Sequence, residues 1–260
     1  MCSVIILRRP DAVWPLVLGA NRDEMANRPW LPPARHWADR PNVVAGLDEL
    51  GGGSWLGIND EGLVAAILNR PGTLGPEEGK RSRGELVLEA LDHADAAEAA
   101  LALAQLDTRA YRPFNLLIAD NRDAYVLVHR GDGISHGSRH RPEPQPVPEG
   151  VHMLTAFDLD DTDDPRTALY LPLFRHAPAP DPDAGSRDTM WGGWPELLGS
   201  RIWDGASARG AMDFRLPNGF GTSSSALIAL PAVERPDLDP IWHFAPGPPH
   251  KTAWNPLDLG

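Results

Sequence analysis

The single cysteine of the sequence, Cys2, directly follows the initiator methionine. Methionine before a small residue such as cysteine is commonly excised, and this would leave Cys2 with a free α-amine. An α-amine has an ordinary pKa of about 7.7 to 8.0, so part of it is unprotonated near neutral pH and can accept the thiol proton. We therefore predict that Cys2 is a nucleophile that carries its own base. The alternative is an incidental buried thiol, since free cysteine behaves as a small hydrophobe.

The run Asn21-Arg22-Asp23-Glu24 is the second candidate for chemistry. If the first hairpin turns around residues 11 and 12, Cys2 lies opposite Asn21 and the whole run lies beside it. The Arg22 guanidinium would then lower the pKa of the thiol, and Asp23 would orient the α-ammonium group. We assign Asn21 and Glu24 to substrate binding. The alternative is a solvated turn with a structural ion pair.

Acyl transfer also needs hydrogen-bond donors for an oxyanion. Asn69 ends the apolar segment 63–68, and we predict that its side-chain amide is such a donor. Asn115 heads another apolar segment and is a weaker candidate, which we assign to substrate binding together with Trp55, Thr222 and Ser223. The alternative for Trp55 is a place in the core or in the wall of a pocket.

The elements that must position these residues are mainly β-hairpins. Apolar, β-branched segments joined by turn residues predict hairpins of 2–8 with 15–20, of 54–58 with 63–68, and of 115–119 with 124–129. The segment 83–106 is rich in Ala, Leu and Glu and breaks near Asp92-His93, which predicts two helices with Ser82 as N-cap. Further helices are expected at 166–174 and 194–202, and late strands at 223–230 and 241–244.

Composition limits the classes of function. A length of 260 residues fits one domain, residues 1–260, and the net charge of −12 disfavours nucleic acid as a partner. One cysteine allows neither an internal disulfide nor a multi-thiolate metal site, and we expect no metal and no cofactor. The first apolar run is too short for a signal peptide or a membrane span, so we expect a cytoplasmic protein.

Several motifs occur together in a consistent order. They are Met1-Cys2, the Asn21–Glu24 run with Arg28-Pro29, the segment Gly53–Ile58, the Asn69 strand and Gly221–Ser225. Together they resemble the NRDE-motif family, which is the transport and Golgi organisation family. That family looks like a branch of the N-terminal-nucleophile hydrolases and is similar, over the first 130 residues, to penicillin V acylases and bile-salt hydrolases.

The resemblance implies an α+β fold, the four-layer αββα sandwich of two antiparallel sheets. It also implies that Asn69 contributes to an oxyanion hole. The chain departs from the acylases at Leu154–Phe157, where they have a second amide side chain and this sequence has no asparagine. Either a backbone N–H supplies the second donor, or acyl transfer is impaired.

Two hypotheses of function follow. The first is an amidohydrolase that acts on a linear carbon–nitrogen bond of a small acylated compound, with Cys2 as nucleophile. The second is a non-catalytic carrier or trafficking factor that uses the same fold for a hydrophobic ligand such as a lipid or haem. A free N-terminal cysteine favours the first hypothesis, and a retained Met1 favours the second; the oligomeric state is not indicated.

Overall fold

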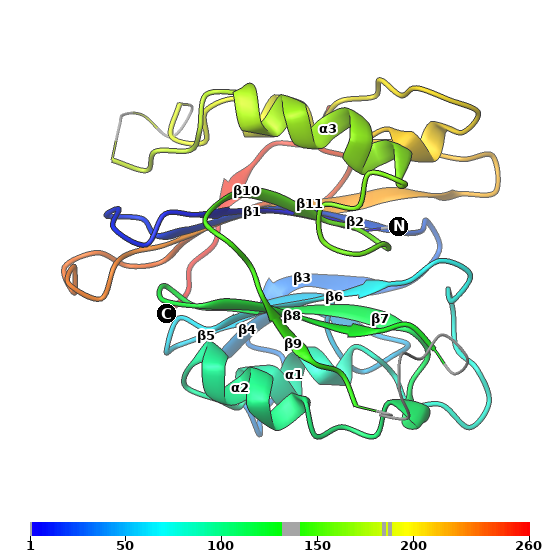
Figure 1. Ribbon diagram of the computed structural model, residues 1–260, viewed down its shortest axis with the longest axis horizontal. Helices are drawn as coiled ribbons and strands as arrows, with labels where there is room; N and C mark the ends of the chain where they lie inside the picture. The colour runs from blue at the N-terminus through cyan, green and yellow to red at the C-terminus, as the bar shows by residue number, and fades with distance from the viewer. Residues whose placement is uncertain (1, 132–140, 184–185, 187–188) are drawn as a thin grey trace. The chain divides into compact units, whose positions relative to one another are not determined.

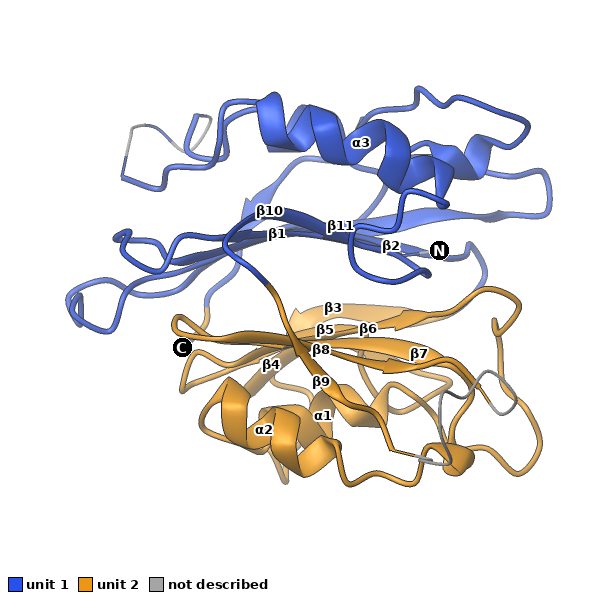
Figure 2. Cartoon of the chain, viewed as in Figure 1, with its two compact units in different colours: residues 1–28, 148–258, 260 blue, residues 29–147, 259 orange. Residues whose placement is uncertain are grey.

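The computed structural model describes residues 2–131, 141–183, 186 and 189–260. The chain forms two compact units, shown in different colours in Figure 2. Unit 1 comprises residues 1–28, 148–258 and 260, and unit 2 comprises residues 29–147 and 259. Each unit contains one antiparallel sheet (Figure 1). The single domain expected from chain length stays a prediction.

The sheet of unit 1 has six strands in the order β10-β1-β2-β11-β12-β13. Its centre is the first hairpin, to which β10 and β11 add on either side. The strands are β1 Ser3–Arg8, β2 Leu16–Met25, β10 Gly150–Leu154, β11 Phe220–Leu230, β12 Ile241–Ala245 and β13 Asn255–Pro256. Strands far apart in the sequence therefore meet beside Cys2.

Two helices, α3 Pro165–His176 and α4 Trp194–Leu198, lie over one face of this sheet (Figure 1). Alternate residues of β1 and β2 pack against them, because successive side chains of a strand point to opposite faces. Gly19 lies under the Trp194 ring, where a Cβ atom would be 3.0 Å from Cε3. Asp164 caps α3 by accepting a hydrogen bond from the N–H of Arg166.

The sheet of unit 2 has seven strands in the order β3-β4-β5-β6-β7-β8-β9. Neighbours in this sheet are also neighbours in sequence, so it is a meander of hairpins. The strands are β3 Trp30–Ala34, β4 Val43–Asp48, β5 Leu56–Asn59, β6 Val64–Asn69, β7 Phe114–Ala119, β8 Ala124–His129 and β9 Pro144–Pro146.

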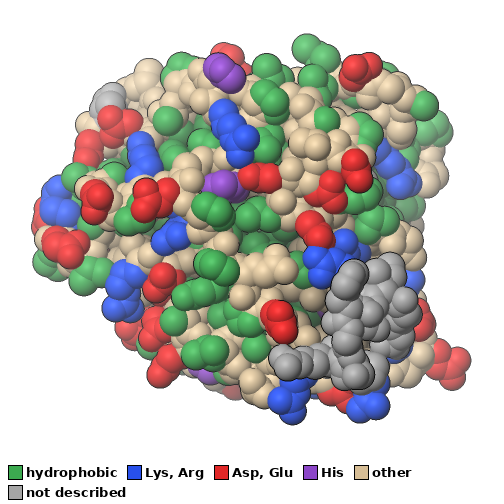
Figure 3. Space-filling view, viewed as in Figure 1, with side chains coloured by type: hydrophobic (Ala, Val, Ile, Leu, Met, Phe, Trp, Pro, Cys, Tyr) green, Lys and Arg blue, Asp and Glu red, His purple; other side chains and the backbone are tan. Residues whose placement is uncertain are grey.

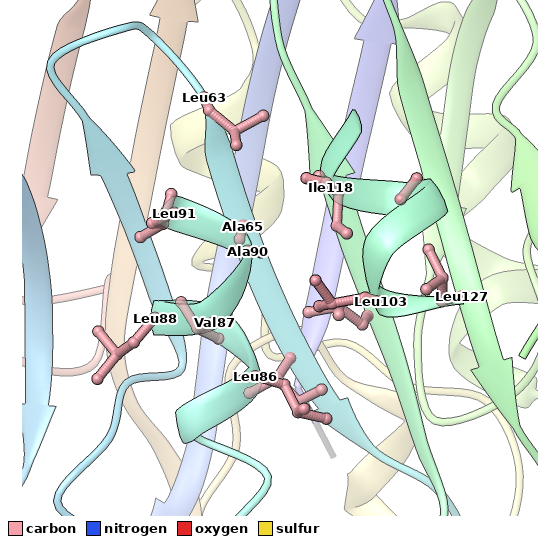
Figure 4. Close-up of a cluster of buried hydrophobic side chains, with 14 of the residues drawn as sticks. Leu63, Ala65, Leu86, Val87, Leu88, Ala90, Leu91, Leu103, Ile118 and Leu127 are labelled. Atoms are coloured by element: carbon pink, nitrogen blue, oxygen red, sulfur yellow. The ribbon is translucent and has the colours of Figure 1, made fainter. Parts of the chain in front are cut away.

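The helices α1 Glu85–Leu91 and α2 Ala96–Leu103 cover one face of the unit 2 sheet. Figure 4 shows their apolar side chains meeting those of β6, β7 and β8. The Asp95 carboxylate accepts a hydrogen bond from the Glu98 N–H and so caps α2. The core cluster includes Leu63, Ala65, Leu86, Val87, Leu91, Leu103, Ile118 and Leu127, all buried. The amphipathic pattern of the helices explains why they stay on the sheet.

The α+β class with two antiparallel sheets is confirmed. The three predicted hairpins are present as β1–β2, β5–β6 and β7–β8, and the two predicted helices between them are α1 and α2. The prediction missed β3, β4, β9, β10 and β13. β3 and β10 lie in segments with proline or glycine signals, which do not show the alternation that marks a strand from sequence.

The register of the first hairpin differs from the prediction by one residue. Ser3, and not Cys2, pairs with Asn21. The connection runs from Arg9 to Pro15. The Arg9 N–H donates to the Pro15 carbonyl oxygen at 2.8 Å, so the hairpin is centred on Ala12. A shift of one residue exchanges the two faces of a strand. It therefore decides which residues of the Asn21–Glu24 run share a face with Cys2.

A partly buried group of charged side chains fixes the turn that follows β10. His152 Nδ1 lies 2.7 Å from Asp160 Oδ2, and Arg175 Nη2 lies 3.0 Å from the same oxygen. His152 Nε2 lies 3.2 Å from the Glu149 carbonyl oxygen, so both ring nitrogens face acceptors and the imidazolium form satisfies both. The hydrogen bond to Asp160 raises the pKa of His152. Although burial opposes it, the hydrogen bond from His152 helps to lower the pKa of Asp160.

These shifts predict a pH-dependent stability. Because the pKa of His152 is raised, this residue contributes stability below about pH 6.5, and the contribution is lost as the pH rises through the folded pKa. Because the pKa of Asp160 is lowered, that residue contributes stability above about pH 4, and the contribution is lost on acidification. We expect His152→Gln to lower the free energy of unfolding by about 1 kcal/mol at pH 5.5 and by clearly less at pH 8.5. Urea titrations at both pH values measure this. His176→Gln is the control, since its ring is exposed and lies 2.7 Å from the Pro172 carbonyl oxygen of its own helix. Equal losses at both pH values in His152→Gln would contradict the pairing.

Candidate active site

Cys2 is half-buried immediately before β1, and its Sγ lies 3.9 Å from the backbone oxygen of Asp23. The pairing of Ser3 with Asn21 continues by one residue to place Cys2 beside Arg22. The structure therefore brings Cys2 next to the Asn21–Glu24 run, as the hairpin predicts, although with a different partner. The run itself is part of strand β2 and forms no turn.

The environment of the thiol does not favour the thiolate while Met1 is attached. Burial raises the pKa of the Cys2 thiol, and the Asp23 carboxylate adds to the rise. The N-terminal ammonium group, the hydrogen bond to the Asp23 backbone and the Arg22 guanidinium oppose the rise, in that order, without reversing it. The expected lowering by Arg22 is thus present but smaller than the effect of burial.

A row of three side chains crosses the sheet on the Cys2 side. Arg22 pairs with Ser224 of β11, so Cys2, Arg22 and Ser224 share one face. Val4 and Ala20 lie in the next row on that face, which is the face that α3 and α4 do not cover. Ser224 is 1% exposed, and its hydroxyl has no hydrogen-bond partner among the described residues. This hydroxyl is available to a ligand, and the sequence analysis did not select it.

The carboxylate of Asp23 lies on the opposite face, in a network of charged and polar groups. Its Oδ2 accepts a hydrogen bond from Arg166 Nη1 at 2.9 Å, and its Oδ1 accepts one from the Thr222 hydroxyl at 2.9 Å. The same Arg166 nitrogen donates to the Ser3 hydroxyl at 2.7 Å. Both charged side chains are almost fully buried, at 1% and 0% exposure.

Arg166 is the main residue that sequence reasoning missed. It belongs to the first turn of α3, far along the chain from Cys2, and its Nε and Nη2 also donate to the Arg209 carbonyl oxygen. Its guanidinium lies 5.3 Å from the centre of the Phe214 ring. An arginine inside a predicted helix gives no sequence signal of its own, because only the tertiary fold brings it to Asp23.

Hydrogen bonds within unit 1 hold the Asn21 side chain in place. Its amide nitrogen donates to the carbonyl oxygens of Leu198 and Met212 at 3.0 and 2.9 Å, and its amide oxygen accepts from the Ser225 hydroxyl at 2.6 Å. Both amide hydrogens are therefore used inside unit 1. The predicted contact of Asn21 with substrate would require these bonds to break.

Glu24 and Ser223 also make local contacts. Glu24 Oε1 accepts from the Met25 N–H, and Oε2 lies 3.8 Å from Arg28 Nε. Ser223 lies at the bulge of β11, and its hydroxyl donates to the Arg22 carbonyl oxygen at 3.1 Å. These contacts fit the structural alternative for Glu24, and its role in substrate binding stays a prediction.

In unit 2, Asn69 is the last residue of β6 and pairs with Phe114. Its side chain is half-buried and makes no hydrogen bond to the described part of the chain. By register it shares a face with Ile67, on the side of the helices. Ile67 N–H donates to Trp55, so the Asn69 N–H points to the same edge of β6. The backbone N–H is thus a second candidate donor at this residue.

The other two candidates in unit 2 have well-defined neighbours. Asn115 is fully buried, and its Oδ1 accepts from Arg70 Nη1 at 2.7 Å. Trp55 packs edge-on against Trp30 and covers Gly46, where a Cβ atom would lie 2.2 Å from the indole. These contacts explain why Trp55 and Gly46 fit together, and the binding roles of Asn115 and Trp55 stay predictions.

The rest of the described chain offers few signs of other chemistry. None of the described helices combines the length and the apolar character that a membrane crossing requires. The described residues contain no group of three or more His, Cys, Asp or Glu side chains able to hold a metal ion. On the face in Figure 3, acidic and basic side chains are interspersed.

Solved structures with a similar fold are N-terminal-nucleophile hydrolases. An orthologue of N-acylethanolamine-hydrolyzing acid amidase from Caenorhabditis elegans aligns with a TM-score of 0.54 at 14% identity, over 87% of this chain and 92% of that one. A mutant of conjugated bile acid hydrolase from Clostridium perfringens aligns with a TM-score of 0.52 at 14% identity, over 99% and 92%. At this level of identity the comparison shows a shared fold.

Sequence comparison gives the family. The chain is 33% identical to the mouse Transport and Golgi organization 2 homolog and 34% identical to the human homolog, each over 165 residues. The match covers 60% of this chain and about half, 56%, of the length of these relatives. The model of the family described as Transport and Golgi organisation 2 matches residues 1–168. The chain therefore belongs to the Transport and Golgi organisation 2 family.

Proposed function

We propose that this protein is an N-terminal-cysteine amidohydrolase that cleaves a linear carbon–nitrogen bond of a small acylated compound. The observation that carries the proposal is the position of Cys2, at the start of β1 and 3.9 Å from Asp23 in the Asn21–Glu24 run. The fold shared with N-terminal-nucleophile hydrolases supports it. The reaction needs no cofactor and proceeds by acyl transfer to sulfur.

In the proposed mechanism, removal of Met1 exposes the α-amine of Cys2. This amine takes the thiol proton while Sγ attacks the acyl carbon of the substrate, and the carbon–nitrogen bond then breaks as the amine passes the proton to the leaving nitrogen. Water attacks the resulting thioester and releases the carboxylic acid. Arg22 stabilises the thiolate, and Asp23 holds the α-ammonium form in place.

The oxyanion needs two donors in this mechanism. Asn69 remains our candidate for one of them, through either its side-chain amide or its backbone N–H. For the other, β10 ends at Leu154, which pairs with Val4, and the same register extended by two residues would bring Ala156 opposite Cys2. We assign the second donor to the backbone N–H of Ala156, because Thr155 and Ala156 stand where acylases have an amide side chain.

A second candidate function is a non-catalytic carrier or trafficking factor for a hydrophobic ligand. The raised pKa of the Cys2 thiol favours it, because a buried protonated thiol is a poor nucleophile. The names of the mouse and human relatives refer to transport and Golgi organization. The two functions differ in one property, namely whether Cys2 becomes a reactive N-terminal residue.

Removal of Met1 should change the thiol from inert to reactive. We expect the chain that begins at Cys2 to react with iodoacetamide with an apparent thiol pKa below the ordinary value of about 8.5, and a chain with lysine inserted after Met1 to show a pKa above it. Intact mass identifies each N-terminus, and alkylation rates from pH 5 to 10 give the pKa. A high pKa in both chains would support the carrier function.

Arg22→Ala in the chain that begins at Cys2 should raise the thiol pKa, because it removes a positive charge that lowers this pKa and that lies beside Cys2 by strand register. Arg28→Ala is the matched control, since Arg28 pairs with Glu24, and it should leave the pKa unchanged. The same alkylation profiles measure both variants. If the two substitutions act equally, Arg22 has no special role.

Arg166 should act as a positioning residue through Asp23. Arg166→Lys removes donors to Ser3 or Arg209, and we expect it to lower kcat by at least tenfold and to shift the pH profile of alkylation. The milder Thr222→Val removes the other hydrogen bond to Asp23, at a stability cost of about 1 kcal/mol. Loss of stability with an unchanged pH profile in both variants would mean that Arg166 only holds the fold together.

A further inference from the structure

A cavity of about 700 Å³, open to solvent, lies at the surface of unit 1 at the beginning of α3. Its walls are the first turns of α3, Phe157 from the turn after β10, and the loop of residues 204–210. Cavities of this volume with mainly apolar walls are typical of small-molecule sites. The apolar lining residues are Phe157, Pro165, Ala168, Leu169 and Ala206.

One side chain connects this cavity to the Cys2 region. Arg209 and Gly210 are part of the wall, and the Arg209 carbonyl oxygen accepts hydrogen bonds from Arg166 at 3.1 and 2.7 Å. Arg166 also binds Asp23 and Ser3, the residue after Cys2. The wall of the cavity is therefore fixed to the same network that fixes the start of β1.

The charges around the cavity select against an anion. Asp164 lies in the wall and is 2% exposed. Its carboxylate oxygens accept hydrogen bonds from the Arg166 N–H and the Thr167 hydroxyl, and no basic side chain of the described chain pairs with it. Asp204 adds a second carboxylate. The guanidinium of Arg209, the basic group of the wall, lies over the Phe220 ring at 5.3 Å. Two carboxylates against one cation disfavour a fatty acid anion.

We propose that this cavity, on the helix side of the unit 1 sheet, binds the apolar chain of a neutral acyl amide whose amide group reaches around the start of β1 to Cys2. The choice of an amide rests on the proposed function, and the apolar chain rests on the lining alone. Binding should strengthen about fourfold for each added methylene group until the chain outgrows the cavity.

The test is isothermal titration of the Cys2→Ala chain, which cannot turn over, with pentanamide, hexanamide, heptanamide and octanamide. Ala168 is exposed on α3 and lines the cavity, so Ala168→Trp fills the space without altering the core. We expect it to weaken octanamide binding at least tenfold. Leu173→Trp is the matched control on the same helix, outside the cavity and 44% exposed, and should change the affinity less than twofold.

Several results would overturn the proposal. They are no binding of octanamide, equal affinity in the Ala168→Trp and Leu173→Trp chains, or tighter binding of octanoate or octylammonium than of octanamide. Failure of the proposed function looks different. If octanamide binds with the expected pattern but the chain that begins at Cys2 does not hydrolyse it, the cavity is a binding site and the protein is a carrier. If the chain hydrolyses octanamide and Ala168→Trp does not change the rate, the protein is an amidohydrolase and the cavity is not its acyl-binding site.

Discussion

The buried ion pair between Asp23 and Arg166 is the interaction on which the arrangement of unit 1 depends. Two opposite charges at about 1% exposure are stable only if their remaining donors and acceptors are satisfied. Ser3, Thr222 and the Arg209 carbonyl oxygen supply these partners. The pair thereby connects the start of β1, the Asn21–Glu24 run, β11, α3 and the loop before β11. Removal of either charge would leave the other buried and unpaired.

The two faces of the unit 1 sheet divide structural and chemical roles. On the face of α3 and α4, Asn21 donates both amide hydrogens, and each carboxylate oxygen of Asp23 accepts a hydrogen bond. On the other face, Cys2, Arg22 and Ser224 form a row in which a thiol, a guanidinium and an unpartnered hydroxyl lie together. Within the Asn21–Glu24 run, Asn21 and Asp23 thus stabilise the fold, and Arg22 faces the candidate site.

The state of the N-terminus decides between enzyme and carrier because it decides the charge around sulfur. With Met1 attached, burial dominates and the pKa of the Cys2 thiol is raised. A free α-amine would bring a base and a positive charge directly to Cys2. The cavity beside α3 serves either function, because an apolar chain can be bound with or without cleavage.

The amino-acid sequence by itself determined the local elements and the main candidate. Alternation of apolar residues and turn signals predicted three hairpins and two helices, and the position of Cys2 after Met1 predicted its place at the start of the first strand. These features depend on neighbours within about 20 residues, and local pattern describes such interactions well.

Only the tertiary structure decided the register, the faces and the distant partners. The connection of Arg9 to Pro15 shifted the pairing by one residue, which no turn signal resolves and which moved Asn21 to the helix side. Arg166 and Ser224 reach the site from 143 and 202 residues beyond Asp23 and Arg22, respectively, because α3 and β11 pack onto the first hairpin. Contacts between residues so far apart in the sequence depend on how helices and sheets pack, and local sequence patterns do not predict this packing.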